Sequence, residues 1–275
     1  MDLNTVTALC RPAQRADIPP FAPGDAWLAG GTALFSEPQP QFARLIDLAA
    51  LNWPALTLTE AGLEIAATCT LAQLEEVMLP PDTPALPLIV QCCQALYGSF
   101  KVRAAASVGG NLCLALPAAP MAALVVALDG VAMIWPATGG SRTLDVADLI
   151  SGPGETTLAP GDLLRSILLP AAALQRRTAL RRIALNPLGR SAALVIGTRD
   201  TDGAFALTVT ASTRRPVRLA FPALPAPDDL AARLAAEIPP PLYHDDVHGA
   251  PEWRRHMTFL FAEQIRAELA EGVRP

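Results

Sequence analysis

Short apolar runs typical of strands alternate with apolar helical segments through the first half of the chain, and this alternation is the feature that most constrains the fold. The predicted strands cover residues 26–28, 44–48, 63–67 and 131–135. Residues 84–96 and 118–128 are predicted to form buried helices. Thr70 and Gln73 have the spacing of a capping box at the start of a further helix. The pattern favours an α/β arrangement for this half of the chain.

The second half is richer in strands and ends in helices. Strand patterns cover residues 163–169, 180–185, 205–211 and 218–224, and helices are predicted at 228–238 and about 252–270. Antiparallel strands with trailing helices indicate a separate α+β unit, so the fold class predicted for the whole chain is α+β. The predicted domains are residues 1–170, in two α/β parts of approximately 1–55 and 56–170, and residues 171–275.

Charge and hydropathy exclude several classes of partner. The chain has 275 residues, 51% of them hydrophobic, and a formal net charge of -5. Without a basic patch to neutralise phosphates, a nucleic acid or an anionic membrane surface is not expected as a partner. No apolar stretch reaches the ~20 residues of a membrane span, and the N-terminus lacks the basic-then-apolar pattern of a signal peptide. We therefore expect a soluble cytoplasmic protein with no membrane span.

The cysteines argue against a metal or iron-sulfur centre in this chain. They are Cys10, Cys69, Cys92, Cys93 and Cys113, an odd number with no C-x-x-C spacing. Thiolate clusters for zinc or iron and sulfur usually have short repeated spacings. Buried, reduced thiols are the expected state.

Two Gly-Gly pairs are the most informative local features. Gly30-Gly31 and Gly109-Gly110 each follow an apolar stretch. Paired glycines let the main chain approach a ligand, and consecutive N–H groups form a nest for an anion, so two such turns suit the two phosphates of a dinucleotide without any Lys or Arg. A tight turn without a ligand also explains each pair taken alone.

Other phosphate motifs are absent. Gly152-Pro153-Gly154 lacks the third glycine of the dinucleotide fingerprint, and Pro153 removes an N–H group. No Gly-Lys-Ser/Thr sequence exists, because Lys101 is the only lysine. Nicotinamide-dependent Rossmann chemistry and P-loop hydrolysis are therefore not expected.

Six segments in order resemble one family. They are LAGGTALF, RLIDL, GLEIAATCTLAQLE, KVRAAASVGGNLCLALPAAP, DLISGPGETTLAPGDLLRSILLP and HGAPEWRRHMTFLFAEQIRAEL. In order and spacing they resemble the FAD-binding (medium) subunit of molybdenum hydroxylases, a family that includes the carbon monoxide dehydrogenase medium subunit and the flavin domain of xanthine dehydrogenase. The resemblance covers nearly the whole chain and implies a PCMH-type FAD-binding domain followed by a C-terminal antiparallel sheet with helices.

The resemblance also implies cofactor-binding residues. In the family the two Gly-Gly segments hold the FAD pyrophosphate, which assigns that role to Ala29, Gly30, Gly31, Thr32, Ala33 and Leu34 in one loop and to Ser107, Val108, Gly109, Gly110 and Asn111 in the other. Tyr97 falls where family members place an aromatic beside the isoalloxazine ring, although a core tyrosine is an equal alternative. Leu164 matches a position near the flavin, and Arg182 falls near a family lysine that contacts the cofactor.

The chain departs from the family at several positions. Ala33 and Pro120 stand where family members often have Asp, and Ala104 replaces an Asn. The missing carboxylates are expected to weaken ribityl hydrogen bonding or flavin affinity. The glycines are unaffected, so FAD binding remains the expectation.

The C-terminal region offers one metal hypothesis and one surface hypothesis. His244 and His248 have i, i+4 spacing with Asp245 and Asp246 between them, but a solvated loop entering the last helix is the favoured interpretation. The polar face of that helix fits either ordinary charge pairing or a contact with a partner subunit; its residues are Glu252, Arg254, Arg255, Glu263, Arg266 and Glu268.

The predicted function is therefore that of an FAD-binding electron-transfer subunit in a molybdenum hydroxylase complex. The resemblance implies a partner iron-sulfur (2Fe-2S) subunit that supplies electrons and a molybdenum-cofactor subunit that hydroxylates the substrate, as a heterotrimer or a dimer of heterotrimers. No residue of this chain is predicted to be a general acid or base. The alternatives are an FAD-free assembly subunit, suggested by Ala33 and Pro120, and a free-standing flavoprotein oxidoreductase.

Overall fold

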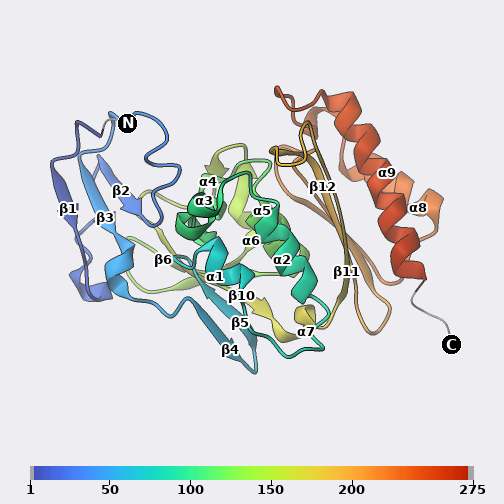
Figure 1. The fold of residues 1–275 in the computed structure, drawn as a ribbon, viewed down its shortest axis with the longest axis horizontal. Helices are drawn as coiled ribbons and strands as arrows, with labels where there is room; N and C mark the ends of the chain where they lie inside the picture. Colours follow the sequence, from blue (N-terminus) through green and yellow to red (C-terminus); the bar gives the residue numbers. More distant parts are fainter. Residues whose placement is uncertain (1–2, 272–275) are drawn as a thin grey trace.

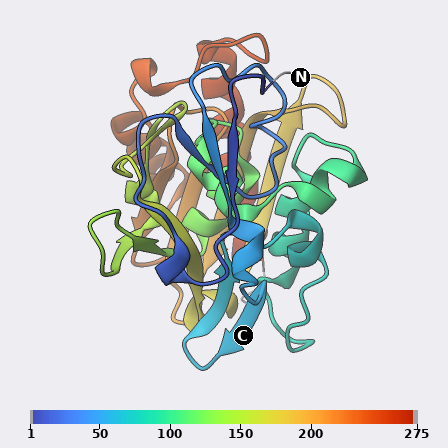
Figure 2. The same ribbon diagram turned by 90° about the vertical axis from the view of Figure 1, so that its left-hand side faces the viewer.

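A small parallel sheet forms the N-terminal part of the chain. The computed structural model describes residues 3–271. Strands β1 (Ala8–Cys10), β3 (Arg44–Asp47) and β2 (Asp25–Leu28) lie in that order, with short 3-10 helices at Arg15–Asp17 and Leu48–Leu51. Figure 1 shows this sheet at the left, and Figure 2 shows it in front of the rest of the chain. The strands predicted at 26–28 and 44–48 are confirmed.

The middle sheet is antiparallel throughout. Its strand order is β4 (Leu56–Thr59), β5 (Gly62–Ala66), β10 (Leu163–Pro170), β6 (Val131–Trp135) and β7 (Arg142–Asp145). Strand β10 pairs with both β5 and β6, so it is the central strand of this sheet. The chain reaches this central position only after the helices and strands β6 and β7 that follow β5. Short strands β8 (Ile150–Gly152) and β9 (Glu155–Thr156) form a separate hairpin.

Helices cover one face of the middle sheet. They are α1 (Leu71–Glu75), α2 (Leu86–Gln94), α3 (Phe100–Ala105), α4 (Val108–Leu114), α5 (Pro120–Ala127) and α6 (Val146–Leu149). The predicted capping box is present, because the Thr70 and Gln73 side chains each accept from the other residue's backbone N–H. Every residue of α5 is buried, since this helix packs against α2, α4 and α6 and also against the C-terminal sheet.

The C-terminal part is an antiparallel sheet with two long helices on its outer face, as Figure 1 shows at the right. After α7 (Ala171–Leu174), strands β11 (Arg177–Ala184), β12 (Ser191–Arg199), β13 (Phe205–Thr210) and β14 (Val217–Phe221) follow one another in the sheet. Helix α8 (Pro227–Glu237), the 3-10 turn Pro240–Leu242 and helix α9 (Pro251–Ala270) complete it. The predicted α+β class is confirmed.

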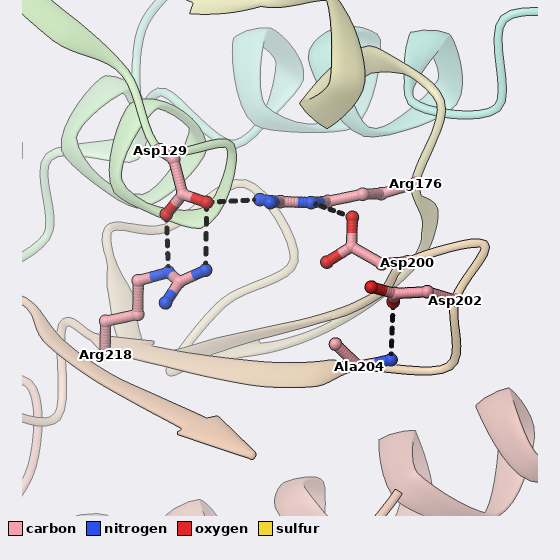
Figure 3. A network of polar contacts seen from close by, with 6 residues as sticks. All are labelled: Asp129, Arg176, Asp200, Asp202, Ala204 and Arg218. Carbon is pink, nitrogen blue, oxygen red and sulfur yellow. Dashed lines mark hydrogen bonds and ion pairs between the residues drawn. The ribbon is translucent and has the colours of Figure 1, made fainter. Parts of the chain in front are cut away.

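A network of ion pairs joins the middle and C-terminal parts, as Figure 3 shows. Asp129 lies in the turn after α5 and accepts from Arg176 at 2.6 Å and from Arg218 at 3.0 Å. Arg176, which leads into β11, also donates to Asp200 at 2.7 Å. One carboxylate of the middle part therefore binds two arginines of the C-terminal part.

Two predictions about side-chain environment are corrected. Arg254 was expected on the polar face of the last helix, but its side chain is only 1% exposed. It donates to the carbonyl groups of Ala192, Ala211 and Gly249 and to Asp246, so it fastens α9 to the sheet. Cys69, Cys92 and Cys93 are buried as predicted, whereas Cys10 is half-buried and Cys113 is exposed. No helix among residues 3–271 is both long and apolar enough to cross a membrane.

Candidate functional site: the junction of the two glycine segments

The first glycine segment is a tight turn that follows β2. Gly31 has φ +69°, in the left-handed region that favours glycine, and a Cβ there would lie 2.6 Å from Cδ2 of Phe35. The turn closes through hydrogen bonds from Phe35 N to Gly31 O at 2.8 Å and from Ser36 N to Ala33 O at 3.0 Å. The N–H groups of residues 30–34 donate to no acceptor within the described part of the chain. They are available to a ligand.

The first segment packs directly against the second. A Cβ added to Gly30 would overlap the carbonyl group of Ala105, with the carbonyl carbon 2.6 Å away, and would lie 3.3 Å from Cα of Ala106. Only glycine permits this approach of the turn to the α3–α4 junction. The structure thus brings together two segments that are distant in sequence.

The second glycine segment is a helix, not the nest that the sequence predicted. Ser107 is the N-cap of α4, and its Oγ accepts from Gly110 N at 3.1 Å. The N–H groups of Val108 and Gly109 donate to the carbonyl oxygens of Cys69 at 2.8 Å and Ala67 at 2.9 Å. Because these donors are already engaged, the segment cannot cradle a phosphate with consecutive backbone N–H groups.

Asn111 and Pro120 belong to one local structure. The Oδ1 atom of Asn111 accepts from Met121 N at 3.1 Å, in the first turn of α5, and leaves its Nδ2 group free to donate. Pro120 occupies the first position of that helix, where a missing N–H costs nothing. This departure from the family pattern has a structural role in starting the buried helix α5.

Tyr97 lies on the surface, so the alternative of a core tyrosine is wrong. Its side chain is 65% exposed, in the segment between α2 and α3, and neighbouring Phe100 is also exposed. An exposed aromatic ring is free to stack against a planar ligand.

Leu164 is buried, and Arg182 is held by hydrogen bonds within the protein. Leu164, on β10, is only 3% exposed and belongs to the main hydrophobic core. Arg182, on β11, donates to Ser191 Oγ at 2.7 Å and to the carbonyl groups of Pro187 and Gly189. Burial lowers the pKa of Arg182. Its donors fix the β11–β12 loop and leave little capacity for a cofactor.

The segment that contains His244 and His248 lines a cavity, and its Asp246 forms an ion pair. His244, Asp246 and Arg254 line a cavity of about 200 Å³ between the middle and C-terminal parts. Asp246 binds Arg254 and lies 3.4 Å from Nε2 of His244. Within residues 3–271 no group of three or more His, Cys, Asp or Glu side chains is placed to hold a metal ion. The carboxylate that a metal would need is used by Arg254.

Sequence reasoning missed a cluster of aromatic and arginine side chains between the first two sheets. Trp53 and Trp135 meet edge to face with ring centroids 5.5 Å apart, and Arg15 and Arg165 stack on them. The available signal was Arg165 itself, a charged residue that interrupts the apolar strand 163–169.

Comparisons with known proteins assign the chain to a family. The model of the FAD binding domain in molybdopterin dehydrogenase matches residues 14–172, more than half of the chain. A xanthine dehydrogenase of Oryza sativa subsp. japonica is 30% identical over 125 residues, which cover 42% of this chain and 9% of that protein. The chain therefore spans a small part of the curated relatives that it matches.

Solved structures show the same fold along nearly the whole chain. The reconstituted CO dehydrogenase from Oligotropha carboxidovorans superposes with a TM-score of 0.78 at 22% identity, covering 94% of this chain and 97% of that chain. Quinoline 2-oxidoreductase from Pseudomonas putida 86 gives a TM-score of 0.76 at 18% identity, covering 97% of each chain. On the family match over residues 14–172, this chain belongs to the family of FAD binding domains in molybdopterin dehydrogenases.

Proposed function

We propose that the chain binds FAD at the junction of the two glycine segments. The observation that carries the proposal is the contact of Gly30 with the backbone of Ala105, which sets the unengaged N–H groups of residues 30–34 beside the start of α4. Unpaired backbone donors in a tight turn suit phosphate oxygens. The family match over this region supports the same ligand.

The proposed cofactor-binding residues would contribute in different ways, some through the main chain and others through side chains. Loop residues 29–34 would bind the diphosphate through the main chain. From the α4 side, Ser107 and Asn111 would contribute their side chains, because the hydroxyl hydrogen of Ser107 and the Nδ2 group of Asn111 remain free. Val108, Gly109 and Gly110 would shape the wall, and Tyr97 would flank the flavin ring. Leu164 and Arg182 would stabilise the surrounding protein and would not contact the cofactor, since Leu164 is buried and Arg182 is hydrogen-bonded to Ser191.

The proposed role is electron transfer within a molybdenum hydroxylase complex. When bound, the flavin supplies the redox chemistry, and the protein supplies binding and tuning. We propose that electrons arrive from an iron-sulfur (2Fe-2S) partner subunit and leave to a terminal acceptor, while a molybdenum-cofactor subunit hydroxylates the substrate. Residues 1–170 would form the FAD-binding domain, and residues 171–275 the C-terminal domain. The solved CO dehydrogenase with this fold supports an assembly of this kind.

Absorbance of the purified chain tests FAD binding. We expect flavin maxima in the near ultraviolet and the blue, and release of FAD rather than FMN on denaturation. Colourless protein that also fails to take up added FAD would refute the proposal and favour an FAD-free assembly subunit, the alternative that Ala33 suggests.

Co-purification tests the subunit role. Expression with the products of the neighbouring genes is expected to yield a complex that contains a molybdenum-cofactor subunit and a small cysteine-rich subunit. Turnover of an organic substrate by the isolated chain would instead identify a free-standing flavoprotein oxidoreductase.

A further inference from the structure

Arg165 differs from every other arginine in residues 3–170. The others each contact a carboxylate or a carbonyl group; the pairs are Arg11–Asp47, Arg15–Gly140, Arg44–Asp25, Arg103–Glu75 and Arg142–Asp162. Arg165 makes no ion pair within the described residues, and its Nη1 atom is buried without a hydrogen-bond partner. An unsatisfied buried donor is costly, so this guanidinium calls for an acceptor that the protein itself does not provide.

A bulge in β10 gives Arg165 its position. The register between β10 and β6 shifts between Leu164 and Ser166, so Arg165 is the extra residue of the strand. Its side chain leaves the core that buries Leu164 and stacks on Trp53, with Cζ 4.3 Å from the ring centroid, and Trp135 lies 5.9 Å away. Burial lowers the pKa of Arg165, but a guanidinium remains charged in proteins.

Packing and hydrogen bonds connect this position to both glycine segments. The Arg165 carbonyl accepts from Ala67 N at 3.0 Å, and the Ala67 carbonyl accepts from Gly109 N at 2.9 Å. Two hydrogen bonds thus lead from the Arg165 backbone to the start of α4. From the other side, Ala29 packs with Trp53 and Trp135 against the cluster of Leu48, Leu51 and Leu163. Two hydrogen bonds therefore connect Arg165 to the start of α4, and its stacking partners share a hydrophobic cluster with Ala29, the residue before Gly30.

We propose that Arg165 binds a phosphate oxygen of the dinucleotide's diphosphate. This inference rests on the proposed FAD binding. The N–H groups in the first turn of α4 already donate to the carbonyl groups of Cys69 and Ala67 and to the side chain of the N-cap residue Ser107. Without a further contact, the two negative charges of the diphosphate would be bound only by the neutral N–H groups of residues 30–34. A guanidinium positioned over the Trp53 ring supplies both a positive charge and a spare donor, and charge-assisted hydrogen bonds to phosphate are the strong ones.

Titration of the flavin-free 275-residue chain with FAD tests the proposal, with flavin fluorescence as the readout. Arg165→Met keeps an apolar stem against Trp53 and removes the charge. We expect it to weaken FAD binding by about 10- to 100-fold, the loss typical of a hydrogen bond to a charged group. The matched control is Arg15→Met, because Arg15 stacks on Trp135 at 4.3 Å but already donates to Gly140. Its FAD affinity should stay within about threefold of wild type.

Salt dependence gives a second readout that a purely structural role would not change. The affinity of the wild-type chain for FAD should fall as salt rises, and the slope should be shallower in Arg165→Met. Arg165→Lys, which keeps the charge but loses the planar fork, should bind FAD with intermediate affinity and serves if Arg165→Met does not fold.

The outcomes distinguish failure of the Arg165 inference from failure of the proposed FAD binding. The inference would be overturned if folded Arg165→Met, or Arg165→Lys where the first variant does not fold, showed wild-type FAD affinity and a wild-type salt slope. Arg165 would then have only a structural role in packing against Trp53 and Trp135. Wild-type protein that takes up no FAD would instead refute the proposed function, and the inference with it.

Discussion

Gly30 and Gly110 lie at the same junction but have different consequences for the fold. Gly30 has no room for a side chain, because the Ala105 carbonyl occupies the space where a Cβ would be. Gly110 is exposed, and a Cβ there would meet only the Ser107 hydroxyl, at 2.8 Å. Substitution at Gly110 therefore tests ligand binding, whereas substitution at Gly30 tests folding.

Gly110→Val is expected to strip FAD from the protein with little loss of fold. The branched side chain would fill open space at the start of α4, where the cofactor is proposed to bind, and the perturbed N-cap would cost about 1 kcal/mol. Flavin content per chain and the thermal midpoint check the two parts of the prediction. Gly110→Ala is the control, since its Cβ meets the same hydroxyl but adds less bulk. Stoichiometric flavin in a folded Gly110→Val protein would contradict the placement of the site.

Tyr97→Ala is expected to lower FAD affinity about tenfold while leaving stability unchanged, because an exposed ring contributes stacking and little core packing. Phe100→Ala, at another exposed aromatic in the same region, provides the comparison and should have a smaller effect. Titration with FAD and thermal unfolding measure the two quantities. Equal affinities for Tyr97→Ala and wild type would remove Tyr97 from the site.

At the scale of elements, an ion pair stabilises the small N-terminal sheet that carries the first glycine turn. Asp25 on β2 and Arg44 on β3 are register partners, and Arg44 Nε donates to Asp25 Oδ1 at 2.8 Å. The hydrogen bond from Arg44 lowers the pKa of Asp25 below its usual value. The pair sits at the start of β2, so it fixes the strand from which residues 29–36 emerge.

The Asp25 pair gives the N-terminal sheet an acid-sensitive component of stability. Because the pKa of Asp25 is lower in the folded chain, its stabilisation is fully present above the unfolded value of about 3.9 and is lost as pH falls through the folded value. Asp25→Asn should lower the free energy of unfolding at pH 7 by about 1 kcal/mol, with a smaller difference from wild type near pH 3. Urea unfolding at both pH values measures this difference. An undiminished difference near pH 3 would show that the charge of Asp25 is not the cause.

The elements that sequence predicted are those whose pattern is set locally. Apolar runs in the sequence predicted β5, β6, α2 and α5, and the Thr70 capping box predicted the start of α1. Strands β1, β4 and β7 were missed because they are short edge strands with exposed polar or mixed sequences. Strand β12 was also missed, although it is buried and lies between β11 and β13.

Tertiary contacts explain the remaining errors at this scale. Helix α4 was expected as a turn because of its two glycines, but the Ser107 cap and the carbonyl groups of Cys69 and Ala67 impose a helix. The pairing of the two glycine segments depends on Gly30 touching Ala105, a contact that no local pattern encodes. The burial of Arg254 and the bulge at Arg165 are likewise properties of packing.

At the scale of the whole molecule, the C-terminal sheet is held against the middle part by a shared hydrophobic core and by the ion pairs of Asp129 with Arg176 and Arg218, here called the clamp. Helix α5 packs against β12 and β13, and the core of the middle part includes Leu194, Ile196 and Ala211 from the C-terminal part. Beside this core, Asp129 binds Arg176 and Arg218, whose side chains are 12% and 23% exposed. Removing Asp129 would leave two largely buried guanidinium groups with fewer acceptors.

Asp129→Asn is therefore expected to destabilise the docked arrangement by about 1–3 kcal/mol, less than for a fully buried pair because Asp129 is partly exposed. The residue has φ +50°, which Asn tolerates as well as Asp, so the change isolates the charge. Asp202→Ala is the control, since Asp202 lies in the same network but only accepts from Ala204 N at 3.0 Å. Chemical denaturation followed by tryptophan fluorescence measures both variants. Equal losses would show that the clamp contributes nothing specific, and docking would then rest on the packing of α5 alone.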